Sequence, residues 1–296
     1  NMDFLKYTVA DARIEEAQKG NIKFRTFDLV KKMPSTKLSN YIFRNNHDLT
    51  FANATKQWGL YRLSVSNSAV YADLDNDGDL DIVSGNFGFN SRLTASANQP
   101  LHCYAKDFDQ NGSIEPIMTF FENGKEYPLM RQDVVVKQMP SLKKRFLYAK
   151  DYGKATVEDI FPRSELNTAL TLSASTLATC WWENQNGRFV CHNLPIQAQV
   201  SPVNGILVDD FNHDGHPDIL LAGNKYGMEV ETGRCDAGIG ALFLGDGKGG
   251  FAWADNRESG FYAGREARDL ALLRSAGGKR LVVVANNNDK PQVFQQ

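Results

Sequence analysis

The sequence is poor in the residues on which most catalytic and metal chemistry depends. Its 296 residues include only four cysteines and five histidines, the latter at positions 47, 102, 192, 213 and 216. No Cys-x-x-Cys pair occurs, so the usual zinc patterns are excluded. No histidine lies near a Gly-x-Ser-x-Gly or comparable nucleophile motif, so the sequence does not indicate a hydrolase triad.

Long apolar runs and a strong net charge are missing as well. No apolar run approaches the roughly 20 residues of a membrane helix, so membrane insertion is not expected. The formal net charge is −2, which argues against nucleic acid or any other partner attracted by overall charge. The first six residues lack a basic start and an apolar stretch, so no signal peptide is visible.

What the sequence does contain is one acidic loop repeated three times, at Asp73–Asp81, Asp107–Glu115 and Asp210–Asp218. Each copy has oxygen side chains at positions 1, 3, 5 and 9, a glycine at position 6 and a backbone carbonyl to offer at position 7. A short loop wraps Ca²⁺ with these groups. The predicted ligands are Asp73, Asp75, Asp77, Asp79 and Asp81; Asp107, Asp109, Asn111, Ser113 and Glu115; and Asp210, Asn212, Asp214, His216 and Asp218.

An EF-hand and a simple solvated turn both fit these loops less well. An EF-hand needs a bidentate Glu at position 12, where the copies have Ser84, Met118 and Leu221. Short β-rich apolar runs follow each loop, so the unit is strand, loop, strand. A solvated turn can be rich in Asp, Asn and Gly, but three copies at the same phase favour a structural metal.

Hairpins form a second repeated unit, at Tyr41–Phe51, Cys180–Cys191 and Ala241–Phe251. Joined to a loop-bearing strand pair, each hairpin completes four strands. The most complete example comprises Gly205–Val208, Ile219–Ala222, Ala241–Leu244 and Gly250–Ala254. Four-stranded units repeated every 50 to 60 residues or so predict an all-β fold, a β-propeller with about five recognisable blades.

The blades are uneven. The loops at Asp73 and Asp107 are too close for a full blade between them, so the first blade is short or takes its outer strands from elsewhere. Helices are predicted at Gln132–Gln138 and at Leu142–Tyr148, with Ser141 as N-cap, giving a helical insertion near residues 131–162. Thr168–Leu172 and the Cys180–Cys191 hairpin are then predicted to form a blade without a loop.

The two ends of the chain are expected to meet. A final unit, Asp269–Leu273 and Arg280–Ala285, has Ser275–Lys279 in place of an acidic loop and should bind no metal. Residues 291–296 match the third strand of a blade. Residues 1–39, with a possible helix at 11–19, are predicted to be a linker or a ring-closing segment. Either Ile22–Phe27 or the Tyr41–Phe51 hairpin would pair with the last blade, because an unpaired edge promotes aggregation.

These motifs resemble the FG-GAP/VCBS repeats of integrin-α-like β-propellers. The loops carry the resemblance, together with the phrases Asn40–Asn45, Leu49–Phe51 and Gly85–Asn86, and it covers residues 40–296. It implies a propeller over residues 40–296, of the kind found at bacterial surfaces and in periplasms. It also implies an extracytoplasmic location and further domains in a longer chain. Glu115, His213 and His216 depart from the pattern, and the longer Glu115 predicts a distorted second site.

The cysteines leave two alternatives open. Pairing Glu183 with Arg188 across an Asn184–Gly187 turn would set Cys180 opposite Cys191, in a geometry that suits a disulfide. Two buried thiols are the other possibility. The basic run Lys143–Arg145, followed by Phe146 and Tyr148, suits an acidic partner or a solvated helix face.

A ligand surface is predicted on the loops that join second and third strands, at Asn86–Pro100, Asn224–Gly238 and Asn286–Lys290. The candidate residues are Asn86, Asn224, Tyr226, Glu229, Glu231, Arg234, Asp236 and Asn287. The alternative is that Glu229, Glu231 and Arg234 only pair with one another. The predicted function is a calcium-stabilised module that binds protein or glycan. The alternative is an enzyme domain acting on polysaccharide, which should show a deep charged pocket rather than a broad aromatic face.

Overall fold

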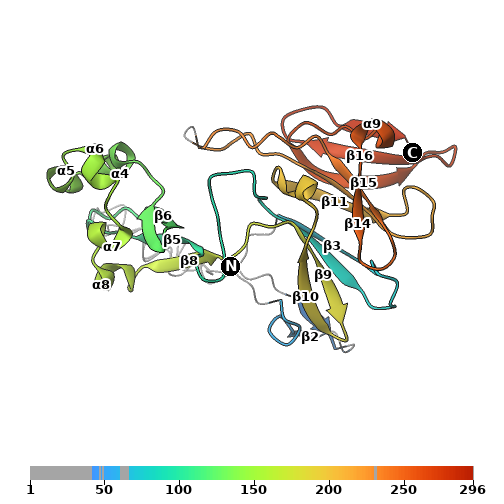
Figure 1. Ribbon diagram of the computed structural model, residues 1–296, viewed down its shortest axis with the longest axis horizontal. Coiled ribbons are helices and arrows are strands. Elements are labelled where there is room, and N and C mark those ends of the chain that lie inside the picture. The colour runs from blue at the N-terminus through green and yellow to red at the C-terminus, as the bar shows by residue number, and fades with distance from the viewer. Residues whose placement is uncertain (1–41, 47, 49, 61–66, 230–231, 296) are drawn as a thin grey trace, which may run out of the picture. The chain divides into compact units, whose positions relative to one another are not determined.

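The computed structural model describes residues 42–295 apart from 47, 49, 61–66 and 230–231, and these residues fall into two compact units. Ala95–Ser175 is the inserted unit, and the described residues of Ser39–Thr94 and Thr176–Gln296 form the main unit (Figure 1). The inserted unit therefore interrupts the main unit in sequence. The predicted strand Ile22–Phe27 and the predicted helix at 11–19 lie outside the described residues.

Three antiparallel sheets make up most of the main unit. The first sheet has the order β10-β9-β4-β3, from β3 (Ser68–Ala72), β4 (Asp81–Gly85), β9 (Cys180–Gln185) and β10 (Arg188–Asn193). The second sheet contains β11 (Val203–Asp209), β12 (Asp218–Gly223), β13 (Ala241–Gly245) and β14 (Phe251–Ala254), in chain order. The third sheet contains β15 (Ala267–Arg274), β16 (Arg280–Asn286) and β17 (Gln292–Gln295).

The sheets pack face to face around their loop-bearing strands. All six residues of β12 are buried, since Ile219 and Leu221 face one apolar cluster and Leu220 and Ala222 face another. The first cluster also holds Val83 of the first sheet, and the second cluster holds residues of the third sheet. A strand covered on both faces has a continuous apolar run rather than an alternating one. The predicted all-β, propeller-type architecture is confirmed.

The first sheet takes its outer strands from far along the chain. Ile82 of β4 pairs with Trp182 of β9, so the hairpin β9–β10 completes the sheet that β3 and β4 begin. The prediction that this hairpin forms a separate blade with Thr168–Leu172 is wrong. Leu170–Ala174 (β8) pairs instead with β5 in the inserted unit. Local sequence identified the strands, but it carries no information on which distant strands pair.

The register of the β9–β10 hairpin also differs from the prediction. Asn186 and Gly187 have φ of 54° and 84°, which gives a two-residue turn with both residues left-handed. Gln185 therefore pairs with Arg188, which places Cys180 opposite Asn193 and Cys191 opposite Trp182. The predicted cross-strand pair of cysteines is wrong, and all four cysteines are thiols in the structure.

The chain before the first sheet forms a hairpin of its own. Strands β1 (Phe43–Asn45) and β2 (Phe51–Asn53) make a two-stranded sheet, which confirms the predicted hairpin. They do not pair with β17, whose partner among the described strands is β16. Of the two segments predicted to close the ring, this hairpin is therefore excluded. Ile22–Phe27 lies outside the described residues, so its pairing with the last blade stays a prediction. Short helices α9 (Asn256–Ser259) and η1 (Ile196–Gln199) complete the main unit.

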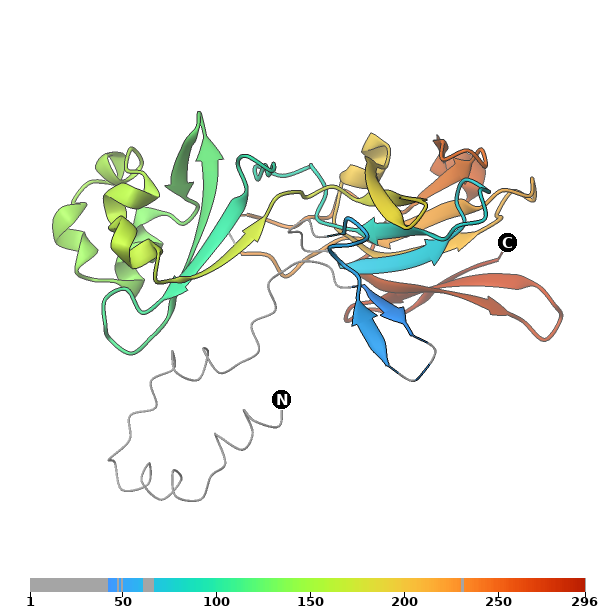
Figure 2. The same ribbon diagram turned by 90° about the horizontal axis from the view of Figure 1, so that it is seen from below.

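The inserted unit is one sheet with helices on one face (Figure 2). The sheet has the order β7-β6-β5-β8, from β5 (Leu101–Lys106), β6 (Glu115–Glu122), β7 (Lys125–Pro128) and β8. The helices are α4 (Gln132–Gln138), α5 (Leu142–Arg145), α6 (Ala149–Tyr152), α7 (Val157–Ile160) and α8 (Arg163–Leu166). Both predicted helices occur, although α5 is shorter than expected and Ser141 makes no side-chain capping bond.

Candidate metal-binding loops and ligand surface

The three acidic loops have one backbone conformation. Position 4 is left-handed in each, with φ of 61° at Asn76, 60° at Gln110 and 63° at His213. The glycine at position 6 is left-handed too, with φ between 89° and 93° in the three loops. A residue with a Cβ is strained in that region, which is why glycine recurs there. The loops join β3 to β4, β5 to β6 and β11 to β12, as predicted.

The aspartate at position 1 closes each loop. Its Oδ2 accepts the backbone N–H of the glycine at position 6, at 3.1 Å in Asp73, 2.9 Å in Asp107 and 3.0 Å in Asp210. These bonds draw the start of the loop over its middle. The carboxylate of position 1 therefore points into the loop.

The carboxylate at position 9 fixes the other end. Asp81 Oδ2 accepts the N–H of Leu74 at 3.0 Å, and Asp218 Oδ2 accepts the N–H of Phe211 at 2.8 Å. Glu115 Oε2 makes the equivalent bond to Phe108 at 2.9 Å, so the longer side chain still reaches position 2. The structure thus shows no displacement of this contact by the extra methylene.

Asp81 and Asp218 also hold the third strand of their sheets. Asp81 Oδ1 accepts the N–H of Asn184 in β9 at 2.8 Å. Asp218 Oδ1 accepts the N–H of Gly245 in β13 at 2.9 Å. Both side chains are buried, so each carboxylate joins the loop to the neighbouring strand inside the protein. We call each of them the latch aspartate of its sheet.

Burial controls the charge of these groups. It raises the pKa of Asp81, Asp218 and Glu115 above the ordinary values, and this outweighs the backbone N–H bonds that lower the pKa. Burial also raises the pKa of Asp75, with repulsion from Asp77 as a further cause. A loop that gathers carboxylates in this way is destabilised by its own ionisation until a cation balances the charge.

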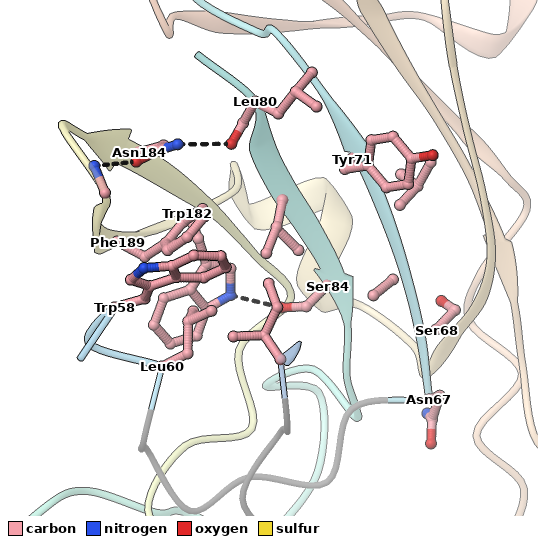
Figure 3. A pocket seen from close by; sticks show the side chains of 15 residues that line it. Trp58, Leu60, Asn67, Ser68, Tyr71, Leu80, Ser84, Trp182, Asn184 and Phe189 are labelled. Atoms are coloured by element: carbon pink, nitrogen blue, oxygen red, sulfur yellow. Dashed lines mark hydrogen bonds between the residues drawn. The ribbon is translucent and has the colours of Figure 1, made fainter. Parts of the chain in front are cut away.

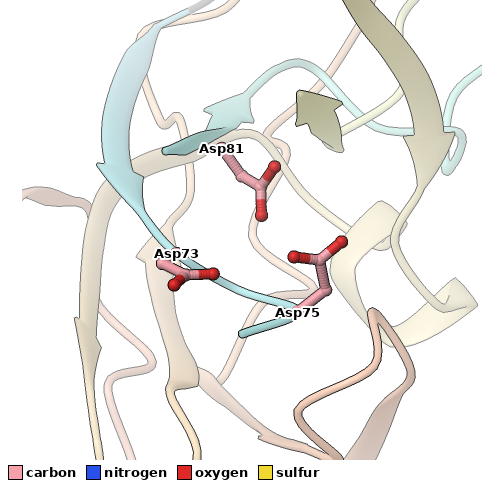
Figure 4. Close-up of side chains that lie close together, drawn as sticks. All are labelled: Asp73, Asp75 and Asp81. Carbon is pink, nitrogen blue, oxygen red and sulfur yellow. The ribbon is translucent and has the colours of Figure 1, made fainter. Parts of the chain in front are cut away.

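Two of the loops bring three carboxyl groups together. Ligand oxygens of Asp73, Asp75 and Asp81 lie within 4.8 Å of one another, and so do those of Asp107, Asp109 and Glu115. Figure 4 shows the first three carboxyl groups around one shared space. Asp73 Oδ1 is buried there and accepts no hydrogen bond from the described residues. Carboxylate oxygens are the ligands that hard cations prefer, so both clusters could bind a metal.

The third loop has a different arrangement at its centre. Position 3 is Asn212, whose Nδ2 donates to Asp214 Oδ2 at 2.8 Å. This bond lowers the pKa of Asp214, in contrast to the raised pKa of Asp75. The first and third loops also meet, since Asn76 Nδ2 lies 3.0 Å from His216 Nδ1.

Asn86 and Asn224, predicted to face a ligand, are buried. Asn224 Nδ2 donates to the carbonyls of Gly238 and Arg265, and its Oδ1 accepts from Ser201. Asn86 Nδ2 donates to the carbonyl of Thr176, at the point where the chain returns from the inserted unit. Both side chains are occupied in closing the connection between second and third strands.

The other predicted ligand residues are only partly brought together. Tyr226 donates to the carbonyl of Gly264, and the Arg234 guanidinium lies 5.0 Å from the Tyr226 ring centroid. Glu229 and Asp236 are exposed, whereas Asn287 donates to Glu266. Glu231 lies outside the described residues, so the predicted pairing among Glu229, Glu231 and Arg234 stays a prediction.

An aromatic groove, which the sequence did not point to, runs across the first sheet. Its cavity is about 660 Å³ and its fifteen lining residues include no charged side chain. Trp58, Trp182 and Phe189 lie together on one side and Tyr71 on the other (Figure 3). Trp182 is held by a 2.9 Å bond from its Nε1 to Ser84 Oγ. The adjacent pair Trp181–Trp182 is the sequence signal that could have indicated this groove. Successive residues of a strand face opposite sides of a sheet, so one of two neighbouring tryptophans lies on the face away from the core.

Comparison with known protein families matches two segments of the chain, and each segment contains one of the acidic loops. Residues 35–84 match an FG-GAP-like repeat and residues 203–243 match an FG-GAP repeat. Two segments of the chain are therefore similar to FG-GAP repeats. The matched segments contain the loops at Asp73 and Asp210, and the loop at Asp107 lies outside them. No curated protein matches the chain.

Proposed function

We propose that this chain is a calcium-stabilised FG-GAP propeller module that binds a protein or glycan ligand outside the cytoplasm. The binding part rests on one observation, the aromatic groove of the first sheet. Tyr71 in this groove is 71% exposed and Leu80 is 53% exposed, so two large apolar side chains of the groove are accessible to a ligand. Acid–base catalysis needs ionisable groups, and the described residues that line the groove include no Asp, Glu, His, Lys or Arg, so the groove supports binding better than the alternative of a polysaccharide-acting enzyme.

Calcium is the cation that the loops suit best. The donors are carboxylate, amide and carbonyl oxygens, and no nitrogen or sulfur ligand is needed. Asp73, Asp75 and Asp81 would hold the ion in the first loop, and the buried Oδ1 of Asp73 would gain a partner. The ion would neutralise the loop and so stiffen the link between two strands.

The extracytoplasmic location is part of the proposal. FG-GAP repeats are typical of extracellular proteins, and millimolar calcium outside cells would saturate even weak loops. Within the described part of the chain, no helix has the length and apolar character needed to span a bilayer.

Calcium and ligand binding can be tested separately. Dialysis against a chelator should lower the melting temperature, and Ca²⁺ should restore it. A melting temperature that ignores both would refute the structural metal. For the groove, a glycan array and a pull-down with Ca²⁺-loaded protein should lose their signal in Tyr71→Ala.

The matched control is Tyr262→Ala, because Tyr262 is 58% exposed but does not line the groove. It should bind like the parent chain. If Arg234→Ala abolished capture and Tyr71→Ala did not, the ligand would bind at the predicted loop surface and the groove would be excluded. The two tyrosine variants change exposed side chains, so their melting temperatures should match that of the parent.

A further inference from the structure

Residues 131–154 of the inserted unit, which include α4, α5 and α6, carry a local positive charge that the net charge of the chain conceals. Residues 131–154 contain seven Lys or Arg against two Asp, a net charge of +5 in a chain of net charge −2. A basic cluster of this kind attracts anionic partners even when the whole protein is weakly acidic.

Three lysines of this region are unbalanced by carboxylates. Lys143, Lys144 and Lys150 are exposed on α5 and α6. Among the described residues, the salt bridges of the helical region involve α4, α7 and α8 and use other cations: Arg131 with Asp133, Arg163 with Glu158, and Lys106 with Glu165. The three ammonium groups therefore face solvent.

Two large apolar side chains stand between these lysines. Leu147 is 65% exposed and Tyr148 is 59% exposed, in the turn that joins α5 to α6. Lys150 Nζ lies 5.5 Å from the Tyr148 ring centroid. We call Lys143, Lys144, Leu147, Tyr148 and Lys150 the basic tip.

The basic tip is firmly anchored. Phe146, next to Leu147, is buried and meets Tyr152 edge to face with ring centroids 5.6 Å apart. Gln132 Nε2 donates to the Phe146 carbonyl at 2.6 Å. Arg145 donates to the carbonyl of Ile160 at 3.0 Å, at the end of α7. The exposed pair is thus presented from a packed backbone, and its exposure does not come from local unfolding.

We propose that the basic tip docks on an anionic lipid surface. Lysines gain from the negative surface potential of such a bilayer, and aromatic and aliphatic side chains gain by entering the headgroup region. The combination of exposed lysines with exposed Leu147 and Tyr148 is explained only by a surface that offers both negative charge and an apolar layer. A linear polyanion would use the lysines and leave the exposed Leu147 in water. The proposed contact is peripheral, made by side chains at the bilayer surface.

Co-sedimentation of the full chain with lipid vesicles tests this. Binding is expected to vesicles of phosphatidylcholine with phosphatidylglycerol, not to phosphatidylcholine alone, and should weaken as salt rises. Lys143→Gln with Lys144→Gln should weaken binding about 25-fold, at about fivefold for each lysine. The matched control, Lys248→Gln with Lys290→Gln, removes the same charge outside the basic tip and should bind like the parent chain.

A second variant separates lipid from polyanion. Leu147→Ser with Tyr148→Ser should weaken vesicle binding while leaving binding to dextran sulfate unchanged. Binding to dextran sulfate without binding to anionic vesicles would overturn the proposal, as would equal loss in the control lysine variant. Melting temperatures near that of the parent are expected for all variants, because every substituted side chain is exposed. Vesicle binding unaffected by both tip variants would also refute the proposal.

Discussion

The first and second sheets of the main unit share one plan but differ greatly in their connections. In the first sheet, 94 residues separate the second strand, β4, from the third strand, β9. In the second sheet, 17 residues separate β12 from β13. Even so, both sheets have a latch aspartate that bonds the third strand, and both have a buried asparagine after the second strand.

This contrast indicates which residues place the third strand in each sheet. The latch aspartate lies at the start of the second strand and the buried asparagine just after its end, so both act on the edge that the third strand must occupy. The length of chain in between does not enter these contacts. A connection of this kind therefore tolerates an inserted unit, provided that the chain returns to the same hydrogen bonds.

Removal of a latch aspartate should give the largest effect. Asp218→Ala removes the acceptor that binds the N–H groups of Phe211, Asn212 and Gly245, and Asp81→Ala removes the acceptor of Leu74 and Asn184. We expect each variant to lose about 3 kcal/mol of unfolding free energy, measured by urea denaturation without metal.

The two losses should agree to within about 1 kcal/mol if the length of the connection is irrelevant. Asp214→Ala, at an exposed position of the third loop, is the control and should change metal-free stability little. A much smaller loss in Asp81→Ala would mean that the inserted unit holds the first sheet by other contacts.

The buried asparagines should separate the two sheets. Asn224 bonds two carbonyls and has a φ of 80°, where alanine is strained, so Asn224→Ala should lose about 3 kcal/mol. Asn86→Ala should lose less, about 2 kcal/mol, since its Nδ2 donates to one carbonyl, that of Thr176, and its Oδ1 accepts the N–H of Phe87. Asn224→Gly removes the strain alone and should recover about 1 kcal/mol, by the same denaturation measurement. Equal losses in Asn86→Ala and Asn224→Ala would contradict this ranking.

The sequence predicted the parts of these sheets well and their assembly poorly. The loops, the strands of the second sheet and α4 followed from local spacing, because turn residues and apolar runs are encoded where they act. The predicted blade of β9 is wrong, because 94 residues separate β9 from the strand with which it pairs and the local sequence does not encode the pairing of such distant strands. In a regular propeller the third strand of a blade follows soon after the second strand. Here the inserted unit separates β4 from β9 and interrupts this regular spacing.

Register and burial were the other limits. A four-residue turn at Asn184–Gly187 and a two-residue turn at Asn186–Gly187 give registers in which the partner of each cysteine differs by two residues. The left-handed φ of Asn186 and Gly187 selects the second turn. The sequence predicts Asn86 and Asn224 on a ligand surface because polar loop residues are usually exposed, yet both are buried. Their burial depends on carbonyls that the next segments bring in, which the sequence does not show.

Metal affinity offers a finer comparison of the same two sheets. Position 3 is Asp75 in the first loop and Asn212 in the third. Fewer charged ligands weaken calcium binding, so Asp75→Asn should lower the affinity of the first loop about tenfold. Asn212→Asp should raise that of the third loop by a similar factor. Isothermal titration with Ca²⁺ measures both, and affinities that do not move in opposite directions would show that other ligands set them.

The smallest effect concerns pH in the metal-free protein. Burial, followed by repulsion from Asp77, raises the pKa of Asp75 above its ordinary value of 3.8, while the bond from Asn212 lowers the pKa of Asp214 in the third loop. A raised pKa in the folded state means that the folded protein holds the proton more tightly than the unfolded chain. Protonated Asp75 therefore contributes to the free energy of unfolding below pH 3.8, and this contribution is lost as the pH rises through the pKa of Asp75 in the folded state.

Asp75→Asn has no carboxyl group to titrate at this position, so the variant is the reference for measuring how Asp75 makes the melting temperature depend on pH. Without metal, the parent chain should melt slightly below the variant at neutral pH, and the gap should close as the pH falls toward 3.8. With saturating Ca²⁺ the order should reverse at neutral pH, because the ion binds the ionised form. A gap that stays constant from neutral to acidic pH would mean that Asp75 is not repelled in the folded loop. The acidic cluster of the first sheet would then be no more strained than the amide-bonded loop of the second.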